Sequence, residues 1–187
     1  MKFALPFLLL LFLAVPVQAS APAGWTRTAL PVQMSYDATN ALLSTETVQA
    51  AVSEWNGSSA FSYAALTPVA GLTSLCFGQT DGISTISWAP LNDPLLIANS
   101  CYYAGECDIV LDYTMLAATD PDIVRAIIVH EAGHCAGLAH SQTTDSVMWA
   151  QVSGGSHHVT ADDRHGICIL YSCPTTGHAV VPNVGKP

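Results

Sequence analysis

Three histidines at fixed spacing, His130, His134 and His140, constrain the fold of this chain more than any other feature of its sequence. Positions four apart lie on one face of a helix, so a helix through His130 and His134 presents both imidazoles to the same point. Gly137 then permits a backbone conformation that ends the helix and returns the chain, with His140, toward that point. The sequence therefore requires a helix, a glycine turn and a returning loop around one site.

This arrangement predicts a metal site. Imidazole is a common zinc ligand, and three protein ligands leave the fourth position open, as in catalytic zinc sites. Glu131 follows the first histidine and lies beside the metal, where it can take a proton from a water molecule. We therefore predict one catalytic zinc ion bound by His130, His134 and His140, with Glu131 as the catalytic base; cobalt or nickel is an alternative metal. The remaining histidines are expected to be ordinary surface residues, namely His157, His158, His165 and His178.

The N-terminus has the pattern of an export signal. Lys2 precedes an almost unbroken apolar run over residues 3–15, and Val17-Gln18-Ala19 is typical of a cleavage site. A retained membrane anchor is the alternative, but the run is shorter than the ~20 residues that a spanning helix needs. We expect residues 1–19 to be a signal peptide, cleaved near Ala19, and the protein to be secreted, either outside the cell or into a periplasm. Residues 20–187 would then form a single catalytic domain, with 174–187 as an irregular tail.

The formal net charge of −9 limits the partners of the chain. An acidic surface repels phosphate groups and anionic lipids, so nucleic acid and membranes are poor partners. We expect a monomer that binds neither of them.

The six cysteines are expected to form disulfides, because an even number in an exported chain favours pairing. Six cysteines allow fifteen pairings. Cys101 and Cys107 are close enough in sequence for a small local loop, which is our first prediction. A bond from Cys135 to Cys168, which would tie the metal-binding helix to a C-terminal helix, is the second. A cysteine zinc site is disfavoured because no C-x-x-C pair is present.

Strands and helices are predicted from periodicity and capping residues. Strands are expected over residues 31–36, 61–66, 82–88 and 108–112, with the third half-exposed. Helices are expected over 45–55, 120–136 and 160–171, with Thr45, Asp120 and Thr160 as N-caps and Pro121 in the first helical position. This order of elements predicts an α+β fold.

The stretch from His130 to His140 resembles the signature of the metzincin zinc endopeptidases, H-E-x-x-H-x-x-G-x-x-H followed by a methionine turn, here Ser146-Val147-Met148-Trp149. The chain looks most like the matrixin branch, which residues 159–171, 48–55 and 82–88 also resemble. The resemblance implies a zincin-like twisted mixed sheet with an active-site helix, a methionine turn and a C-terminal helix. It places Met148 beneath the metal without ligating it; an ordinary core methionine is the alternative.

The resemblance implies a secreted zinc-dependent endopeptidase. Its polypeptide substrate would bind in extended form along an edge strand formed by Ser84, Thr85, Ile86, Ser87 and Trp88. Trp149 and Gly154-Gly155 would wall a specificity pocket. A structural calcium has no support in the sequence. Two alternatives remain, a zinc amidase acting on cell-wall peptides and a non-catalytic secreted metal-binding module, although a module that only binds metal has no use for Glu131.

Overall fold

The computed structural model describes residues 23–173, except residues 40, 59, 75, 77–79, 104 and 152–154. The expected signal peptide, the expected tail from residue 174 and Gly154 lie outside the described residues. Within the described part of the chain, no helix is long and apolar enough to cross a membrane.

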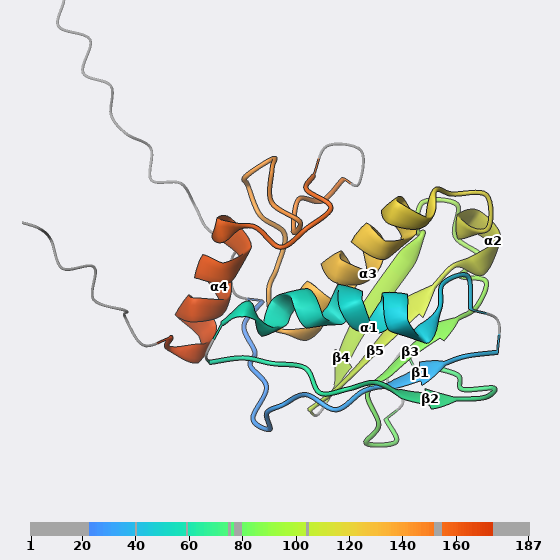
Figure 1. Cartoon of the computed structure of the whole chain (residues 1–187), viewed down its shortest axis with the longest axis horizontal. Helices are drawn as coiled ribbons and strands as arrows, with labels where there is room; N and C mark the ends of the chain where they lie inside the picture. The colour runs from blue at the N-terminus through green and yellow to red at the C-terminus, as the bar shows by residue number, and fades with distance from the viewer. Residues whose placement is uncertain are drawn as a thin grey trace, which may run out of the picture.

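A mixed sheet of five strands underlies the fold (Figure 1). In spatial order the strands are β2 (Thr67–Val69), β1 (Ser35–Asp37), β3 (Thr85–Trp88), β5 (Glu106–Leu111) and β4 (Ala98–Tyr103). Neighbouring strands are parallel except for β4, which runs antiparallel to β5. Since β4 is the last strand in this order, its outer edge has no neighbouring strand among the described residues.

The strand expected to pair with substrate lies in the interior of this sheet. β3 has β1 on one side and β5 on the other, and residues 84–88 are all buried. The polar side chains that suggested a half-exposed strand make internal hydrogen bonds: Thr85 donates to Asp108, and the Ser87 hydroxyl accepts from the Ser74 amide. The prediction that residues 84–88 form a free edge is therefore wrong, and the edge strands among the described residues are β2 and β4.

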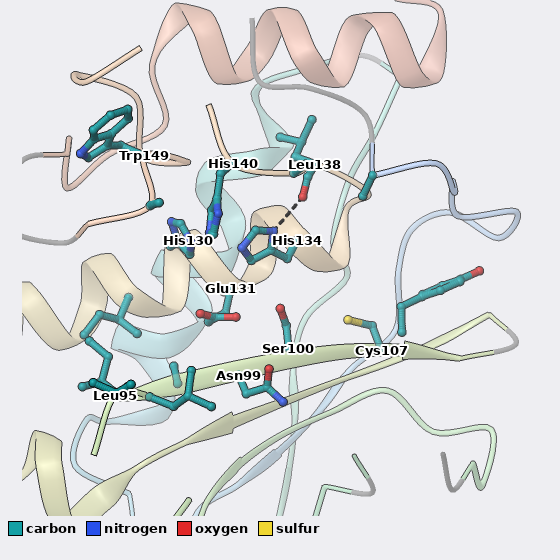
Figure 2. Close-up of a pocket in the computed structure, with 18 of the residues that line it drawn as sticks. Leu95, Asn99, Ser100, Cys107, His130, Glu131, His134, Leu138, His140 and Trp149 are labelled. Carbon is teal, nitrogen blue, oxygen red and sulfur yellow. Dashed lines mark hydrogen bonds between the residues drawn. The ribbon is translucent and has the colours of Figure 1, made fainter. Parts of the chain in front are cut away.

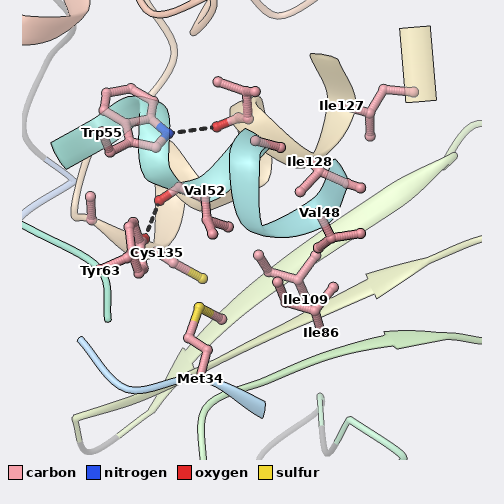
Figure 3. Close-up of a cluster of buried hydrophobic side chains, with 14 of the residues drawn as sticks. Met34, Val48, Val52, Trp55, Tyr63, Ile86, Ile109, Ile127, Ile128 and Cys135 are labelled. Atoms are coloured by element: carbon pink, nitrogen blue, oxygen red, sulfur yellow. Dashed lines mark hydrogen bonds between the residues drawn. The ribbon is translucent and has the colours of Figure 1, made fainter. Parts of the chain in front are cut away.

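Helices α1 (Thr45–Ser53) and α3 (Pro121–Cys135) lie side by side over one face of the sheet (Figures 1 and 3). The core between helices and sheet consists of fully buried aliphatic side chains: Val48, Val52, Ile86, Ile109 and Ile128. Trp55, in the short 3-10 helix η1 (Glu54–Gly57), donates its indole hydrogen to the carbonyl oxygen of Val129 across 2.9 Å. This packing fixes α3, and the residues it carries, against a rigid base.

Two helix starts lie where the sequence predicts them. The Asp120 side chain accepts from the Asp122 amide at 2.8 Å, and Pro121 is the first residue of α3. Helix α4 (Ala161–Tyr171) follows Thr160. Helix α1, in contrast, is capped by Ser44, whose hydroxyl accepts from the Thr47 amide at 3.2 Å, and not by Thr45.

The strand predictions are less accurate. The strand expected over residues 31–36 is shortened to β1, and the stretch expected over 61–66 forms only isolated bridges at Phe61 and Tyr63 before β2 begins. The sequence analysis predicted neither β4 nor the short helix α2 (Tyr113–Leu116).

The disulfides are Cys76–Cys101, Cys107–Cys135 and Cys168–Cys173, so both predicted pairings are wrong. The register of β4 and β5 explains the error. Cys107 lies opposite Tyr102, and residues that lie opposite each other point to the same face of a sheet, whereas neighbours along a strand point to opposite faces. Cys101 therefore points away from Cys107. Cys107 faces α3 and bonds there to Cys135.

Candidate metal centre

Helix α3 carries the first two histidines and the glutamate. His130 and His134 lie one turn apart near its end, and Figure 2 shows both rings directed into one cavity. Glu131 lines the same cavity, with 8% of its surface exposed. Because α3 is packed along its length, these three side chains project from a fixed backbone.

The chain leaves α3 at Gly137, whose φ of +99° strains any residue with a side chain. A Cβ atom there would also lie 2.6 Å from the carbonyl oxygen of Trp25. The turn brings His140 back beside the other two histidines (Figure 2). One ligand nitrogen from each of the three rings lies within 4.8 Å of the other two, which is a spacing that a single metal ion can bridge.

Hydrogen bonds determine which ring nitrogens face the cavity. Nδ1 of His130 lies 2.7 Å from the carbonyl oxygen of Val147, and Nδ1 of His134 lies 2.8 Å from that of Leu138. A carbonyl oxygen can only accept, so each Nδ1 carries the hydrogen and each Nε2 keeps a free lone pair. Backbone partners of this kind orient the histidine ligands of metal sites. The donor set therefore fits a zinc ion.

Burial favours the neutral form of two of these imidazoles. It lowers the pKa of His134 below its ordinary value, and the charge of Glu131 only partly opposes this effect. Burial also lowers the pKa of His140, and the neighbouring His134 lowers it further. Since only the neutral ring has a lone pair for a metal, these shifts favour metal binding.

A buried carboxylate holds the segment beneath the histidines. Asp163, the third residue of α4, accepts hydrogen bonds from the Ser146 hydroxyl and from the Val147 amide at 3.1 Å. It also accepts from the Thr160 hydroxyl at 2.7 Å. Burial alone would raise the pKa of Asp163, but these hydrogen bonds outweigh it and the pKa lies below its ordinary value.

Met148 is fully buried against α3. A Cβ atom on Gly133 would collide with the Met148 sulfur and would lie 2.6 Å from the Trp55 ring. Helix α3 is therefore in direct contact with Met148 at Gly133, the residue before His134.

The histidines and Glu131 lie in a cleft of about 900 Å³ between α3 and the edge strand β4. Ala98, Ser100 and Tyr102 line it from β4, and Trp149 lines it from the other side of the histidines (Figure 2). A cleft along an unpaired strand edge can accept an extended peptide.

Residues 25–172 match the family model of the matrixins, a peptidase family. The chain belongs to the matrixin family. Two curated relatives from Arabidopsis thaliana are similar over shorter stretches: Metalloendoproteinase 2-MMP is 39% identical over 70 residues, and Metalloendoproteinase 5-MMP is 42% identical over 50 residues. These stretches cover 36% and 26% of this matrixin but only 17% and 14% of the two relatives.

A solved structure with the same fold is a chain of the ECX AB5 holotoxin in its GM1-bound form. It superposes on this matrixin with a TM-score of 0.51 at 13% sequence identity, covering 75% of this chain and 79% of that chain. At this identity the likeness concerns the fold alone.

Of the residues predicted for the site of this matrixin, His130, His134, His140, Glu131 and Trp149 lie around one cleft, whereas residues 84–88 do not reach it. The sequence analysis missed the cleft residues of β4. A signal for them exists: Tyr102 and Tyr103 have high strand propensity and are followed by Gly105 and a second strand, which is typical of a hairpin. Assigning Cys101 and Cys107 to a local disulfide loop obscured it.

Proposed function

We propose that this matrixin is a zinc-dependent endopeptidase that hydrolyses peptide bonds with Glu131 as general base. One observation carries the proposal. Three imidazoles with ligand nitrogens within 4.8 Å of one another share a cleft with a carboxylate that accepts no hydrogen bond from the described residues. A carboxylate left free beside a metal site is available for proton transfer.

The ligands in this proposal are the imidazole groups of His130, His134 and His140. Their number supports a catalytic site, because a structural zinc is enclosed by four protein ligands. When bound, zinc would lower the pKa of water toward about 7 and polarise the carbonyl group of the substrate. A single catalytic ion accounts for the three histidines.

Glu131 moves the proton. Its carboxylate accepts a proton from the attacking water, and the resulting acid donates that proton to the nitrogen of the departing amine, so the carboxylate is regenerated in each cycle. The support is its position next to His130 on α3, in the wall of the cleft.

The substrate is a polypeptide that adds to the outer edge of β4 in extended form. Antiparallel addition is the more stable pairing, and its backbone hydrogen bonds do not depend on substrate sequence. This assignment replaces the one made for residues 84–88, because β4 is the edge strand of the described sheet that borders the cleft. Trp149, across the histidines from β4, is then a wall of the pocket for a substrate side chain.

The turn at Met148 serves as an apolar floor for the histidines in this proposal and does not ligate the metal. Its support is the complete burial of Met148 and its contact with α3 at Gly133. We also infer that the protein is secreted after cleavage near Ala19 and that residues 20–187 form one catalytic domain. Three disulfides, which form in oxidising compartments, support secretion.

The test is cleavage of casein by the purified, zinc-loaded protein, with and without a zinc chelator, beside Glu131→Gln and Glu131→Ala variants. We expect wild-type cleavage, complete loss on chelation with recovery on adding zinc, and a loss of about 10²–10⁴-fold in kcat in both variants, which should retain zinc. Full activity in either variant would refute the mechanism. Cleavage of peptidoglycan fragments but not of casein would replace the endopeptidase with an amidase.

A further inference from the structure

An aromatic pair lines part of the cleft. The ring of Trp25 stacks on that of Tyr102, with ring centroids 3.8 Å apart and planes within 5° of parallel. Tyr102 belongs to the edge strand β4, whereas Trp25 comes from the N-terminal segment, and both line the cavity that holds Glu131. We call this pair the aromatic wall. Zinc binding and proton transfer make no use of it.

The backbone around Trp25 is fixed to the turn that follows α3. The Ala23 amide donates to the carbonyl oxygen of Gly137 across 2.7 Å, and the Trp25 carbonyl oxygen packs against Gly137 itself. The aromatic wall is therefore attached to the same turn that brings His140 to the histidine cluster.

Arg27 holds the segment from its other side. It is buried, and its guanidinium group donates to the carbonyl oxygens of Cys135, at 3.1 Å, and of Gly105. Its central carbon lies 5.7 Å from the centroid of the Tyr102 ring. The ion pairs of the described residues do not include Arg27, and its guanidinium group also donates to the Ser84 hydroxyl at 3.2 Å, so neutral dipoles and the aromatic ring offset its charge.

We propose that the aromatic wall is a substrate subsite that selects a neutral apolar side chain, above all one with a ring, on the N-terminal side of the scissile bond. The inference rests on the proposed function, because antiparallel addition to β4 places that side of the substrate beside Tyr102. Side chains on one face of a strand repeat about every 6.6–6.8 Å, so the residue beside Tyr102 lies about two positions from the residue beside Ser100. Trp25 and Tyr102 are specificity-determining residues, and Arg27 is a positioning residue.

The chemistry of the wall defines the preference. A preorganised aromatic surface gains contact area and stacking energy from a ring, and little from a small side chain. The buried guanidinium group of Arg27, 5.7 Å from the centroid of the Tyr102 ring, places a positive charge behind the wall, which disfavours a lysine or arginine side chain there. The subsite therefore ranks phenylalanine and tyrosine above leucine, leucine above alanine, and alanine above lysine.

The test uses matched peptides that differ only at this position, carrying phenylalanine, alanine, lysine or glutamate. Binding is measured by titration calorimetry to zinc-loaded Glu131→Ala protein, and kcat/KM is measured with the otherwise unmodified enzyme. We expect phenylalanine to be favoured over alanine by about fivefold to tenfold in both measurements. Introducing Trp25→Ala should reduce that ratio to below about twofold, and Trp25→Phe should retain most of it.

Tyr103→Ala is the matched control, because Tyr103 is exposed, follows Tyr102 on β4 and points to the other face of the strand. Its phenylalanine-to-alanine ratio should equal that of the wild type. If Trp25→Ala does not fold, Trp25→Leu takes its place and should give an intermediate ratio. An unchanged ratio in the Trp25 variants, or a preference for glutamate, would overturn the inference while leaving the proposed function intact. Absence of any peptide binding or cleavage by the wild type would overturn both.

Discussion

His130 donates its Nδ1 hydrogen to the carbonyl oxygen of Val147 across 2.7 Å, and this bond connects α3 to the residue before Met148. The amide of the same Val147 donates to Asp163 of α4. One peptide segment therefore joins a carboxylate in the last helix to the orientation of an imidazole in the metal centre. Removing the carboxylate should therefore weaken zinc binding.

Asp163→Asn is expected to weaken zinc binding by about 10–100-fold, which is the usual effect of losing a partner that orients a metal ligand. It should also lower the free energy of unfolding by roughly 1.5–3 kcal/mol, because a charged acceptor is lost. Competition with a chromophoric chelator and urea denaturation measure the two effects. Asp122→Asn, on the exposed first turn of α3, is the control. Equal zinc affinity in both variants would contradict the connection through Val147.

The metal-free protein should lose stability on mild acidification. The pKa values of His134 and His140 lie below the ordinary value of 6.5 because burial disfavours the charged rings. Below about pH 6.5 the unfolded chain therefore binds more protons than the folded one, and the free energy of unfolding falls as the pH falls. Asp163, with its lowered pKa, adds a further loss below about pH 3.8.

The measurement is the Tm of chelator-treated protein between pH 7.5 and 5. His134→Gln should flatten this dependence, whereas His165→Gln, at an exposed position on α4, should leave it unchanged. A Tm that rises on acidification would contradict the predicted loss of stability at lower pH.

Gly133→Ala should destabilise the protein although alanine is the better helix former. The higher helix propensity of alanine alone would raise the free energy of unfolding by about 1 kcal/mol. The added methyl group collides with Met148 and the Trp55 ring, and overpacking of this kind costs typically 1–3 kcal/mol. Thermal denaturation should show a lower Tm, and the Gly133→Ala/Met148→Ala double variant should be less destabilised than the sum of the single variants. Strict additivity would mean that the two residues do not interact.

The double variant Cys107→Ala/Cys135→Ala should lower the free energy of unfolding by about 3–4 kcal/mol, because the bond joins residues 28 positions apart. Removing Cys168–Cys173, whose separation is 5, should cost roughly 2 kcal/mol by the same loop-entropy argument. Denaturant titration of the oxidised wild type and of each double variant measures the two losses in free energy of unfolding. The reverse order would mean that loop length does not govern these bonds.

The sequence predicted local features of this matrixin well and long-range ones poorly. The start of α3 follows from Asp120 and Pro121, and the approach of His130 to His134 follows from helical spacing, so both depend on neighbours in the chain. The edge position of β4 depends on which strands pair. The alternation of polar and apolar residues over 82–88 predicts a strand but not its position in the sheet. The disulfides required the register of β4 on β5, which decides the face of the sheet to which Cys101 and Cys107 each point.

The Cys107–Cys135 bond also affects when the backbone around His134 becomes fully restrained. Cys135 follows His134 directly, so the covalent link from β5 restrains the backbone beside a proposed metal ligand. In a reducing compartment these thiols stay apart, and the last turn of α3 is then held by packing and by hydrogen bonds such as that from Arg27 to the Cys135 carbonyl oxygen. Oxidation completes the restraint. If the chain is exported as proposed, the site would therefore reach its full rigidity only in an oxidising compartment.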